Sequence, residues 1–170
     1  MKSSEKEALV HECLVKNYGK YYKIAYSYTF HEQDAMDVVQ EGAYRAILKS
    51  DSLKQPEYAD TWICRIMIRE AIRFLEKNRG KTVDLAEIPE EGRVDQMADP
   101  DLKEALSSLD EKDRAIVVLR FFEEEKLETI GRMLDLNVNT VKSRLYRAMD
   151  KLKKYMETGG ANYGKMEKGV

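Results

Sequence analysis

The stretch from residue 127 to residue 152 constrains the fold of this chain more than any other. A short helical pattern over Leu127–Leu134 is followed by a tight turn, Asp135-Leu136-Asn137, and by a second helical pattern. Two helices joined by a tight turn form a helix-turn-helix. The second helix carries apolar residues at steps of three and four, the spacing of a buried face. They are Val141, Leu145, Ala148 and Leu152.

The other face of this helix carries hydrogen-bond donors long enough to reach base edges in a DNA major groove. Asn139 is expected to cap the helix by accepting a hydrogen bond from an amide of its first turn. Arg144 is better placed to reach a phosphate. The residues predicted to bind DNA here are Asn139, Thr140, Lys142, Ser143, Arg144, Tyr146 and Arg147. The alternative is an ordinary amphipathic helix with a solvated basic face.

Charge is spread unevenly along the 170 residues, whose net charge is −2. Residues 137–154 hold six basic side chains against one acidic one, whereas residues 79–100 hold three against six. A basic helix on an acidic chain predicts one docking point on DNA, with affinity helped by another partner. Because the sequence begins with an amphipathic pattern rather than an apolar signal core, we expect a cytoplasmic protein without direct membrane insertion.

Residues that usually mark metal or catalytic sites are sparse. Cys13 and Cys64 lack Cys-x-x-Cys spacing, so buried free thiols are expected rather than a disulfide or a zinc site. His11 and His31 form no His-Glu-x-x-His pattern, and no nucleophile motif or phosphate-binding glycine loop occurs. We therefore expect no metal, no cofactor and no catalytic residue.

The helical patterns fall into two parts. Residues 1–78 are predicted to form an N-terminal domain of roughly four helices, and residues 101–158 a C-terminal domain that contains the helix-turn-helix. Residues 79–100 lack helical periodicity and predict a flexible linker, and residues 159–170 a disordered tail. The expected fold class is all-α, with two small helical domains joined by a flexible acidic linker.

The helix expected over about residues 32–49, capped by Thr29 or a neighbour, has one apolar and one polar side. The side predicted to be buried contains Ala35, Val38, Val39, Ala46 and Ile47. The polar strip contains Asp34, Asp37, Gln40 and Glu41. Carboxylates one turn apart can serve acid–base chemistry, bind a metal or meet Arg and Lys of a protein partner; a solvated helix face is the alternative.

A further helix, opened by Pro56 and running to about Lys77, carries arginines every four positions along one side. Its expected core stripe includes Trp62, Ile63, Ile66, Ile72 and Leu75. A positive helical edge beside aromatic residues can follow a nucleic-acid backbone and stack an unpaired base. The predicted contacts of this helix and the loop before it are Leu53, Tyr58, Arg65, Arg69 and Arg73. The alternatives are solvated or internally paired arginines and a Trp62 that packs in the core.

Three motifs in this order resemble the extracytoplasmic-function (ECF) sigma factors, promoter-recognition subunits of bacterial RNA polymerase. Residues 34–41, Asp-Ala-Met-Asp-Val-Val-Gln-Glu, are similar to the family's Asp-Ala-Glu-Asp-Val-Val-Gln-Glu run. Residues 61–66, Thr-Trp-Ile-Cys-Arg-Ile, are similar to its Thr-Trp-Leu-Tyr-Arg-Ile. Residues 140–148 are similar to the family's recognition helix, and the whole resemblance covers about residues 6–156.

The resemblance implies a role for each motif. It places the polar strip, Asp34, Asp37, Gln40 and Glu41, on the helix that docks on the clamp coiled coil of the polymerase core. It implies that the loop 50–60 and the helix after it open and read the −10 element as single-stranded DNA, and that residues 140–148 read the −35 element as a duplex. It also implies an anti-sigma factor as a partner, often a membrane-bound one, and a stress or envelope response.

The sequence departs from the family pattern at three positions. Leu53 stands where an aromatic residue is frequent, and Arg69 where an asparagine is common. Gly131 replaces the usual alanine in the first helix of the helix-turn-helix, where glycine costs about 1 kcal/mol relative to alanine.

These observations favour a non-enzymatic sigma factor that directs the polymerase core to promoters and assists DNA opening. The alternative is a stand-alone helix-turn-helix regulator whose first domain binds a ligand or signals. Such a regulator needs neither the polar strip nor the arginine-lined helix after a polar loop. A helical metal-dependent hydrolase is the third reading.

Overall fold

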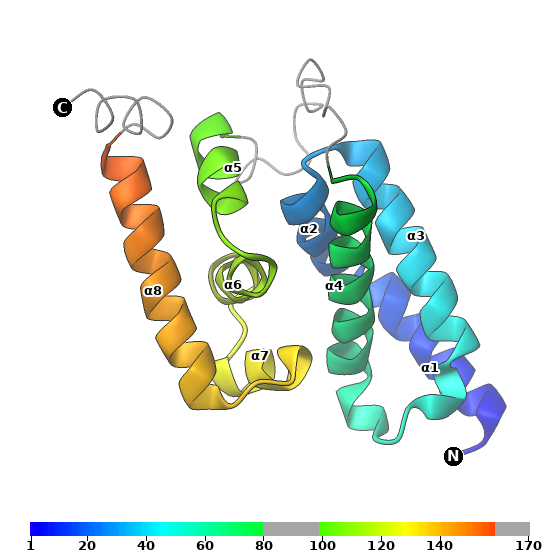
Figure 1. The fold of residues 1–170 in the computed structure, drawn as a ribbon. Coiled ribbons are helices and arrows are strands. Elements are labelled where there is room, and N and C mark those ends of the chain that lie inside the picture. Colours follow the sequence, from blue (N-terminus) through cyan, green and yellow to red (C-terminus); the bar gives the residue numbers. More distant parts are fainter. Residues whose placement is uncertain (80–98, 159–170) are drawn as a thin grey trace. The chain divides into compact units, whose positions relative to one another are not determined.

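The computed structural model describes residues 1–79 and 99–158, which fold into two compact helical units (Figure 1). Over these residues the structure contains no strand, which confirms the predicted all-α class with two helical parts. Most of the predicted linker and all of the predicted tail lie outside the described residues. In the described ranges, no helix combines the length and the apolar character needed to cross a membrane.

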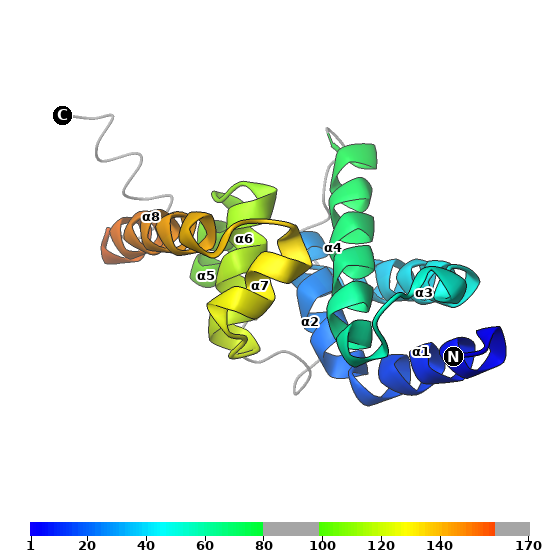
Figure 2. The ribbon, with the colours of Figure 1, turned by 90° about the horizontal axis from the view of Figure 1, so that it is seen from below.

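The first unit contains four helices, as predicted, and two short 3₁₀ turns. The helices are α1 (Ser3–Lys16), α2 (Tyr18–Thr29), α3 (Glu32–Leu48) and α4 (Ala59–Lys77), and the 3₁₀ turns between α3 and α4 are Ser50–Ser52 and Pro56–Tyr58. Helices α2, α3 and α4 pack on one another, and α1 packs against α3, α4 and the first 3₁₀ turn (Figure 2). His31 caps α3, because its side chain accepts a hydrogen bond from the Asp34 amide.

The core of the first unit differs from the prediction on α4. On α3, Ala35, Val38, Val39 and Ala46 are buried as expected, while Ile47 is only half-buried. On α4, Ile63 alone of the predicted stripe is buried; the remaining core residues are Ala59, Cys64, Met67, Ile68 and Ala71. Helices α3 and α4 approach closely where Gly42 of α3 faces the thioether of Met67. Glycine allows this approach, because a Cβ at position 42 would collide with the sulfur. This close approach fixes which face of α4 is buried.

The second unit contains residues 99–131 and 136–158. It contains α5 (Pro100–Ser107), α6 (Glu111–Val117), residues 127–131 of α7 (Leu127–Leu134) and α8 (Val138–Glu157), and a π-helical segment, Val118–Phe122, continues α6. Helix α6 begins at the Asp110 cap, whose carboxylate accepts a hydrogen bond from the Asp113 amide at 2.8 Å. Helix α8 packs on α5 and α6.

Gly131 makes the turn of the helix-turn-helix possible. Its carbonyl accepts a hydrogen bond from the Leu136 amide at 2.8 Å. A Cβ at position 131 would lie 2.7 Å from the Leu136 carbonyl oxygen and 3.7 Å from Val141 Cγ2. The departure from alanine therefore lets the backbone of the turn approach α7, an advantage that offsets the helix-propensity cost of glycine.

Candidate nucleic-acid and protein interfaces

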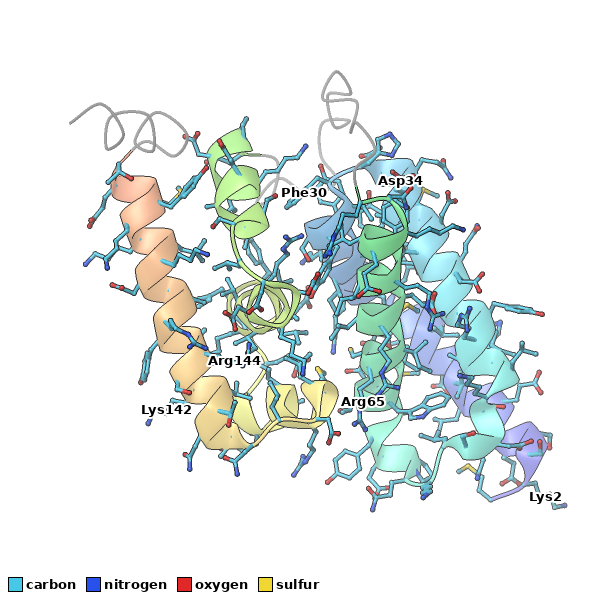
Figure 3. All side chains as sticks on the ribbon, in the orientation of Figure 1. Lys2, Phe30, Asp34, Arg65, Lys142 and Arg144 are labelled. Atoms are coloured by element: carbon cyan, nitrogen blue, oxygen red, sulfur yellow. The ribbon has the colours of Figure 1, made fainter. Side chains whose placement is uncertain are left out.

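Helix α8 divides its side chains between the core and solvent as the sequence predicts. The buried residues are Val141, Leu145, Ala148 and Leu152. The predicted donors are exposed: Lys142, Ser143, Tyr146 and Arg147. Figure 3 shows Lys142 on the outer side of α8 and Arg144 on the side that faces α6. The outer face of α8 is therefore not used by the packing of its own unit.

Arg144 does not lie on this outer face, which corrects its predicted placement toward a phosphate. Its Nη1 is 2.9 Å from Asp113 Oδ1 and 3.6 Å from Asp110 Oδ2. The Arg144 side chain is 26% exposed and that of Asp113 is 12% exposed. The guanidinium thus joins α8 to the start of α6, and the sequence pattern missed this because both acidic residues precede it by about thirty positions.

The cap of α8 is also two residues earlier than predicted. Asn137, and not Asn139, caps the helix: its side-chain oxygen accepts a hydrogen bond from the Asn139 amide at 2.8 Å. Both asparagines suit a cap, and the tight turn decides between them. Asn139 and Thr140 are exposed in the first turn. A helix N-terminus is a favourable place for a phosphate, and the contact of these two residues with DNA stays a prediction.

The basic side chains of α8 differ in their partners. Lys153 pairs with Glu157 at 3.9 Å and Lys154 with Asp150 at 3.1 Å. Within residues 1–79 and 99–158, neither Lys142 nor Arg147 forms an ion pair. Both residues belong to the exposed donor set, whereas Lys151 donates a hydrogen bond to the Ser108 carbonyl at 2.7 Å.

The polar strip lies on the solvent side of α3. Asp37, Gln40 and Glu41 are exposed, and Asp34 is half-buried near the helix start (Figure 3). Glu41 accepts a hydrogen bond from Arg45 Nε at 3.2 Å, and the same nitrogen lies 2.7 Å from the buried carboxylate of Glu70. Arg45 therefore fixes Glu41 in place while offsetting part of its charge.

Two apolar residues missed by the sequence analysis extend this strip. Tyr44 and Leu48 keep 60% and 64% of their surface exposed. Tyr44 follows Asp37 by seven positions and Leu48 follows Glu41 by seven, so they lie on the same side of α3. The 3.6-residue helical period alone would have predicted that Tyr44 and Leu48 lie on this side. We define the docking face as Asp34, Asp37, Gln40, Glu41, Tyr44 and Leu48.

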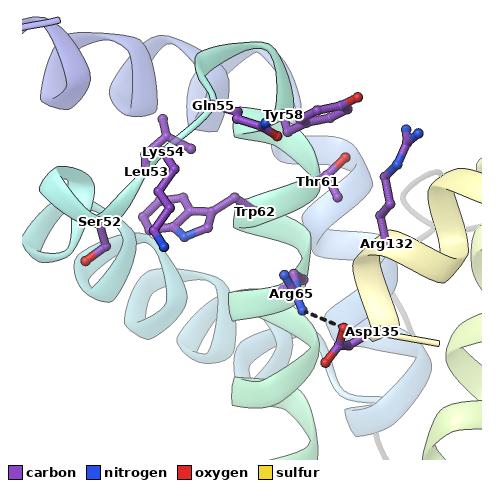
Figure 4. Close-up of a pocket in the computed structure, with 10 residues that line it drawn as sticks. All are labelled: Ser52, Leu53, Lys54, Gln55, Tyr58, Thr61, Trp62, Arg65, Arg132 and Asp135. Atoms are coloured by element: carbon purple, nitrogen blue, oxygen red, sulfur yellow. Dashed lines mark ion pairs between the residues drawn. The ribbon is translucent and has the colours of Figure 1, made fainter.

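The loop before α4 has a buried start and an exposed middle. Leu53 is 1% exposed, so it packs in the core and its predicted contact with a base is corrected to a packing role. Lys54 and Gln55 are exposed, and Tyr58 is half-buried. Figure 4 shows Tyr58 and Trp62 near this loop. Trp62 is half-buried, so it is neither fully packed in the core nor fully exposed for stacking, the two alternatives that the sequence left open.

The arginines of α4 follow one side of the helix with unequal exposure. Arg69 and Arg73 are exposed, and Arg65 is half-buried. Arg73 Nη1 lies 2.9 Å from Glu70 Oε1, so it has an internal partner, as the sequence allowed. Its side chain is still 55% exposed and can reach solvent ligands. Among the described side chains, no group of three or more His, Cys, Asp and Glu is arranged to hold a metal ion.

Comparison with known families matches both units. A family model described as sigma-70 region 2 matches residues 14–81, and one described as sigma-70, region 4, matches residues 105–154. The first match contains the docking face, the loop and the arginine side of α4. The second contains the helix-turn-helix.

Curated relatives are sigma factors along most of their length. RNA polymerase sigma factor SigV of Bacillus subtilis (strain 168) is 37% identical over 151 residues, which cover 87% of this chain and 91% of that protein. RNA polymerase sigma-E factor of Streptomyces antibioticus is 30% identical over 129 residues, 74% of this chain and 72% of that protein. ECF RNA polymerase sigma factor SigW of Bacillus subtilis (strain 168) is 26% identical over 155 residues, 81% of this chain and 83% of that protein.

Two solved structures share the fold. CnrH, solved in complex with the cytosolic domain of CnrY, has a TM-score of 0.70 at 20% identity, covering 91% of this chain and 94% of that one. Sigma factor RpoE from Bartonella quintana, solved with the anti-sigma factor NepR, has a TM-score of 0.63 at 22% identity, covering 85% and 94%. With the two region matches and the SigV identity, the chain belongs to the ECF sigma factors, DNA-binding subunits that direct the RNA polymerase core to promoters and assist DNA opening in transcription initiation.

Proposed function

We propose that α8 reads the −35 element with the exposed donors opposite its buried stripe. Lys142, Ser143, Tyr146 and Arg147 are placed to reach base edges in the major groove. Asn139 and Thr140, in the first turn, are placed to meet the phosphate backbone. Arg144 acts indirectly by holding α8 against α6 through Asp113.

In the first unit, the loop 54–58 and the arginine side of α4 act on the −10 element. Tyr58 offers an aromatic ring for an unpaired base, and Arg65, Arg69 and Arg73 offer positive charge to the displaced strand. Leu53 supports the loop from beneath and does not contact DNA. Base capture supplies part of the free energy that separates the strands.

The docking face binds the clamp coiled coil of the polymerase core. Its acidic half, Asp37 with Glu41, suits the basic surface that the family resemblance implies for that coiled coil. Its apolar half, Tyr44 and Leu48, suits the anchoring positions of an interface, where exposed aromatic and aliphatic side chains become buried. The two halves lie along one helix and present one continuous partner surface.

Regulation and location follow from the same family. Both structural neighbours were solved in complex with another protein, the cytosolic domain of CnrY in one case and the anti-sigma factor NepR in the other. We infer that this chain is a cytoplasmic, non-enzymatic factor, held inactive by an anti-sigma factor and released in a stress or envelope response. The anti-sigma factor holds the chain at the membrane when it is itself membrane-bound.

One observation carries this proposal. Helix α8 has a buried apolar face and an exposed face of hydrogen-bond donors, and the same chain has the docking face on α3. Run-off transcription with host core polymerase and host genomic fragments tests it. Discrete transcripts that require both the chain and the core are expected. Tight, sequence-specific DNA binding by the chain alone at physiological salt would instead identify a stand-alone regulator.

A further inference from the structure

A polar network centred on Asp60, whose side chain is 32% exposed, joins the start of α4 to α2. Asp60 lies in the first turn of α4, and its carboxylate accepts a hydrogen bond from the Tyr21 hydroxyl at 2.8 Å. The same carboxylate forms an ion pair with Lys20 Nζ, whose side chain is 13% exposed. The Cys64 thiol, one turn further along α4, lies 3.7 Å from Asp60 Oδ1. One carboxylate therefore gathers three donors from two helices.

The network also includes a residue of α1, and the Tyr21 hydroxyl in it keeps its proton. Tyr21 is fully buried, and Cys13 Sγ of α1 lies 3.5 Å from its hydroxyl. Burial, the hydrogen bond with Cys13 and the charge of Asp60 all raise the pKa of the Tyr21 phenol far above its ordinary range. The phenol therefore stays protonated at physiological pH and donates to Asp60.

The network lies at one end of the loop that precedes α4, and a second anchor holds the other end. Leu53 and Ser50 are 1% and 5% exposed, and Lys6 Nζ of α1 donates to the Asp51 carbonyl at 3.1 Å. The residues between the anchors, 54–58, are exposed or half-buried. An exposed segment of five residues is thus held at both ends by the unit's own packing.

We propose that Asp60 is a positioning residue for promoter opening: through Tyr21 and Lys20 it holds residues 54–58 in the shape that receives an unpaired −10 base. The proposal rests on the role proposed above for this loop. A loop ordered before binding loses less conformational entropy when it captures a base, and small misplacements of a binding group weaken capture steeply. A carboxylate in the first turn also stabilises α4 through the helix dipole, so loss of function has to be separated from loss of stability.

The test compares Asp60→Asn, Tyr21→Phe and the double variant in the full chain with core polymerase. Glu76→Gln is the matched control, because it neutralises an exposed carboxylate on the same helix. The rate of open-complex formation, measured by permanganate reactivity of −10 thymines, is expected to fall about tenfold in each single variant, as expected for a hydrogen bond to a charged group. The double variant should lose little more than either single one. Core affinity should stay at the parental level, and a template mismatched across the −10 element should restore transcription.

Opening at the parental rate in both single variants would overturn the proposal. A defect that persists on the mismatched template, or that follows a fall in core affinity, would equally overturn it by showing a purely structural role. If Asp60→Asn unfolds at the assay temperature, Tyr21→Phe decides the outcome, because it keeps the aromatic ring. A variant with residues 54–58 replaced by Gly and Ser serves as the reference. If that variant opens DNA normally, the proposed loop function fails; if it is defective while Asp60→Asn is normal, only the positioning role fails.

Discussion

Arg144 Nη1 of α8 lies 2.9 Å from Asp113 Oδ1 of α6, and this ion pair holds α8 against the rest of its unit. The arginine stands between Ser143 and Leu145, one on the exposed face and one in the core. Its side chain turns inward, whereas Arg147, three residues later, stays exposed without an ion pair within the described residues. The two arginines therefore have different surroundings, and we propose that Arg144 holds the helix while Arg147 contacts DNA.

Arg144→Ala is expected to destabilise the second unit by about 1–3 kcal/mol, because it leaves the nearly buried Asp113 carboxylate without its charged partner. Urea denaturation of the chain measures this. A double-mutant cycle with Asp113→Asn should show strong coupling between the two residues. Unchanged unfolding free energy, together with uniformly weaker DNA binding, would restore Arg144 to a phosphate contact.

Arg147→Ala should leave the unfolding free energy nearly unchanged and weaken promoter binding by about 1–3 kcal/mol. The loss should fall on one base pair of the −35 element, because a bidentate contact reads one base. Binding of the holoenzyme to a panel of promoter variants measures this preference. Lys153→Ala is the control, since this lysine lies on the same helix and pairs with Glu157. An equal loss on every promoter variant would show that Arg147 contacts only phosphate.

Asp37→Lys combined with Glu41→Lys should reduce affinity for the core polymerase at least tenfold, through repulsion from a basic partner surface. Glu7→Lys with Glu12→Lys makes the same change of charge on exposed positions of α1 and should have little effect. Circular dichroism checks that α3 remains folded, since Arg45 loses its partner Glu41. Equal core affinities for both double variants would show that the acidic residues of α3 form a solvated helix face and no interface.

Tyr44→Ala tests the apolar half of the docking face separately. The side chain is 60% exposed, so its removal should cost little stability. An anchoring aromatic residue at an interface typically costs about 2 kcal/mol or more when truncated, so core affinity should fall. Titration of labelled core polymerase measures the change. If core affinity is unaffected, Tyr44 is not part of the interface.

Gly131→Ala should lower the melting temperature although alanine favours helices by about 1 kcal/mol over glycine. The added Cβ would lie 2.7 Å from the Leu136 carbonyl oxygen and force the turn to move. Gly19→Ala is the matched control, because no atom lies within 4 Å of its added Cβ in α2, and it should raise the melting temperature. Equal stabilisation at both positions would show that the turn adapts without cost.

Periodicity was sufficient for the helices and for the faces of α8. The buried stripe from Val141 to Leu152 and the exposed donors follow from the 3.6-residue period, which needs no knowledge of the neighbouring helices. Local signals also located the turn at residues 135–137. Tyr44 and Leu48 were within reach of the same reasoning, since they lie on the polar side of α3 by spacing alone.

Contacts between residues far apart in the sequence could not be predicted from the sequence pattern. On a helical wheel, Arg144 falls among the exposed basic residues of α8. Its carboxylate partners become evident only from the position of α6 in the structure. Leu53 follows the loop pattern in the sequence, yet in the structure it is only 1% exposed. The core stripe of α4 was misplaced because apolar residues occur around most of the helix, and the approach of Gly42 to Met67 selects the buried side.

Permanganate footprinting of a host promoter tests the central claim most directly, because it reports recognition and strand opening in one measurement. With the chain and core polymerase together, thymines near the −10 element should become reactive. The chain alone and the core alone should leave them protected. The Gly-Ser replacement of residues 54–58 should abolish reactivity while −35 contact persists. Normal reactivity in the loop-replaced chain would contradict the role of the loop, and no reactivity with the parental chain and core on any host promoter would contradict promoter opening itself.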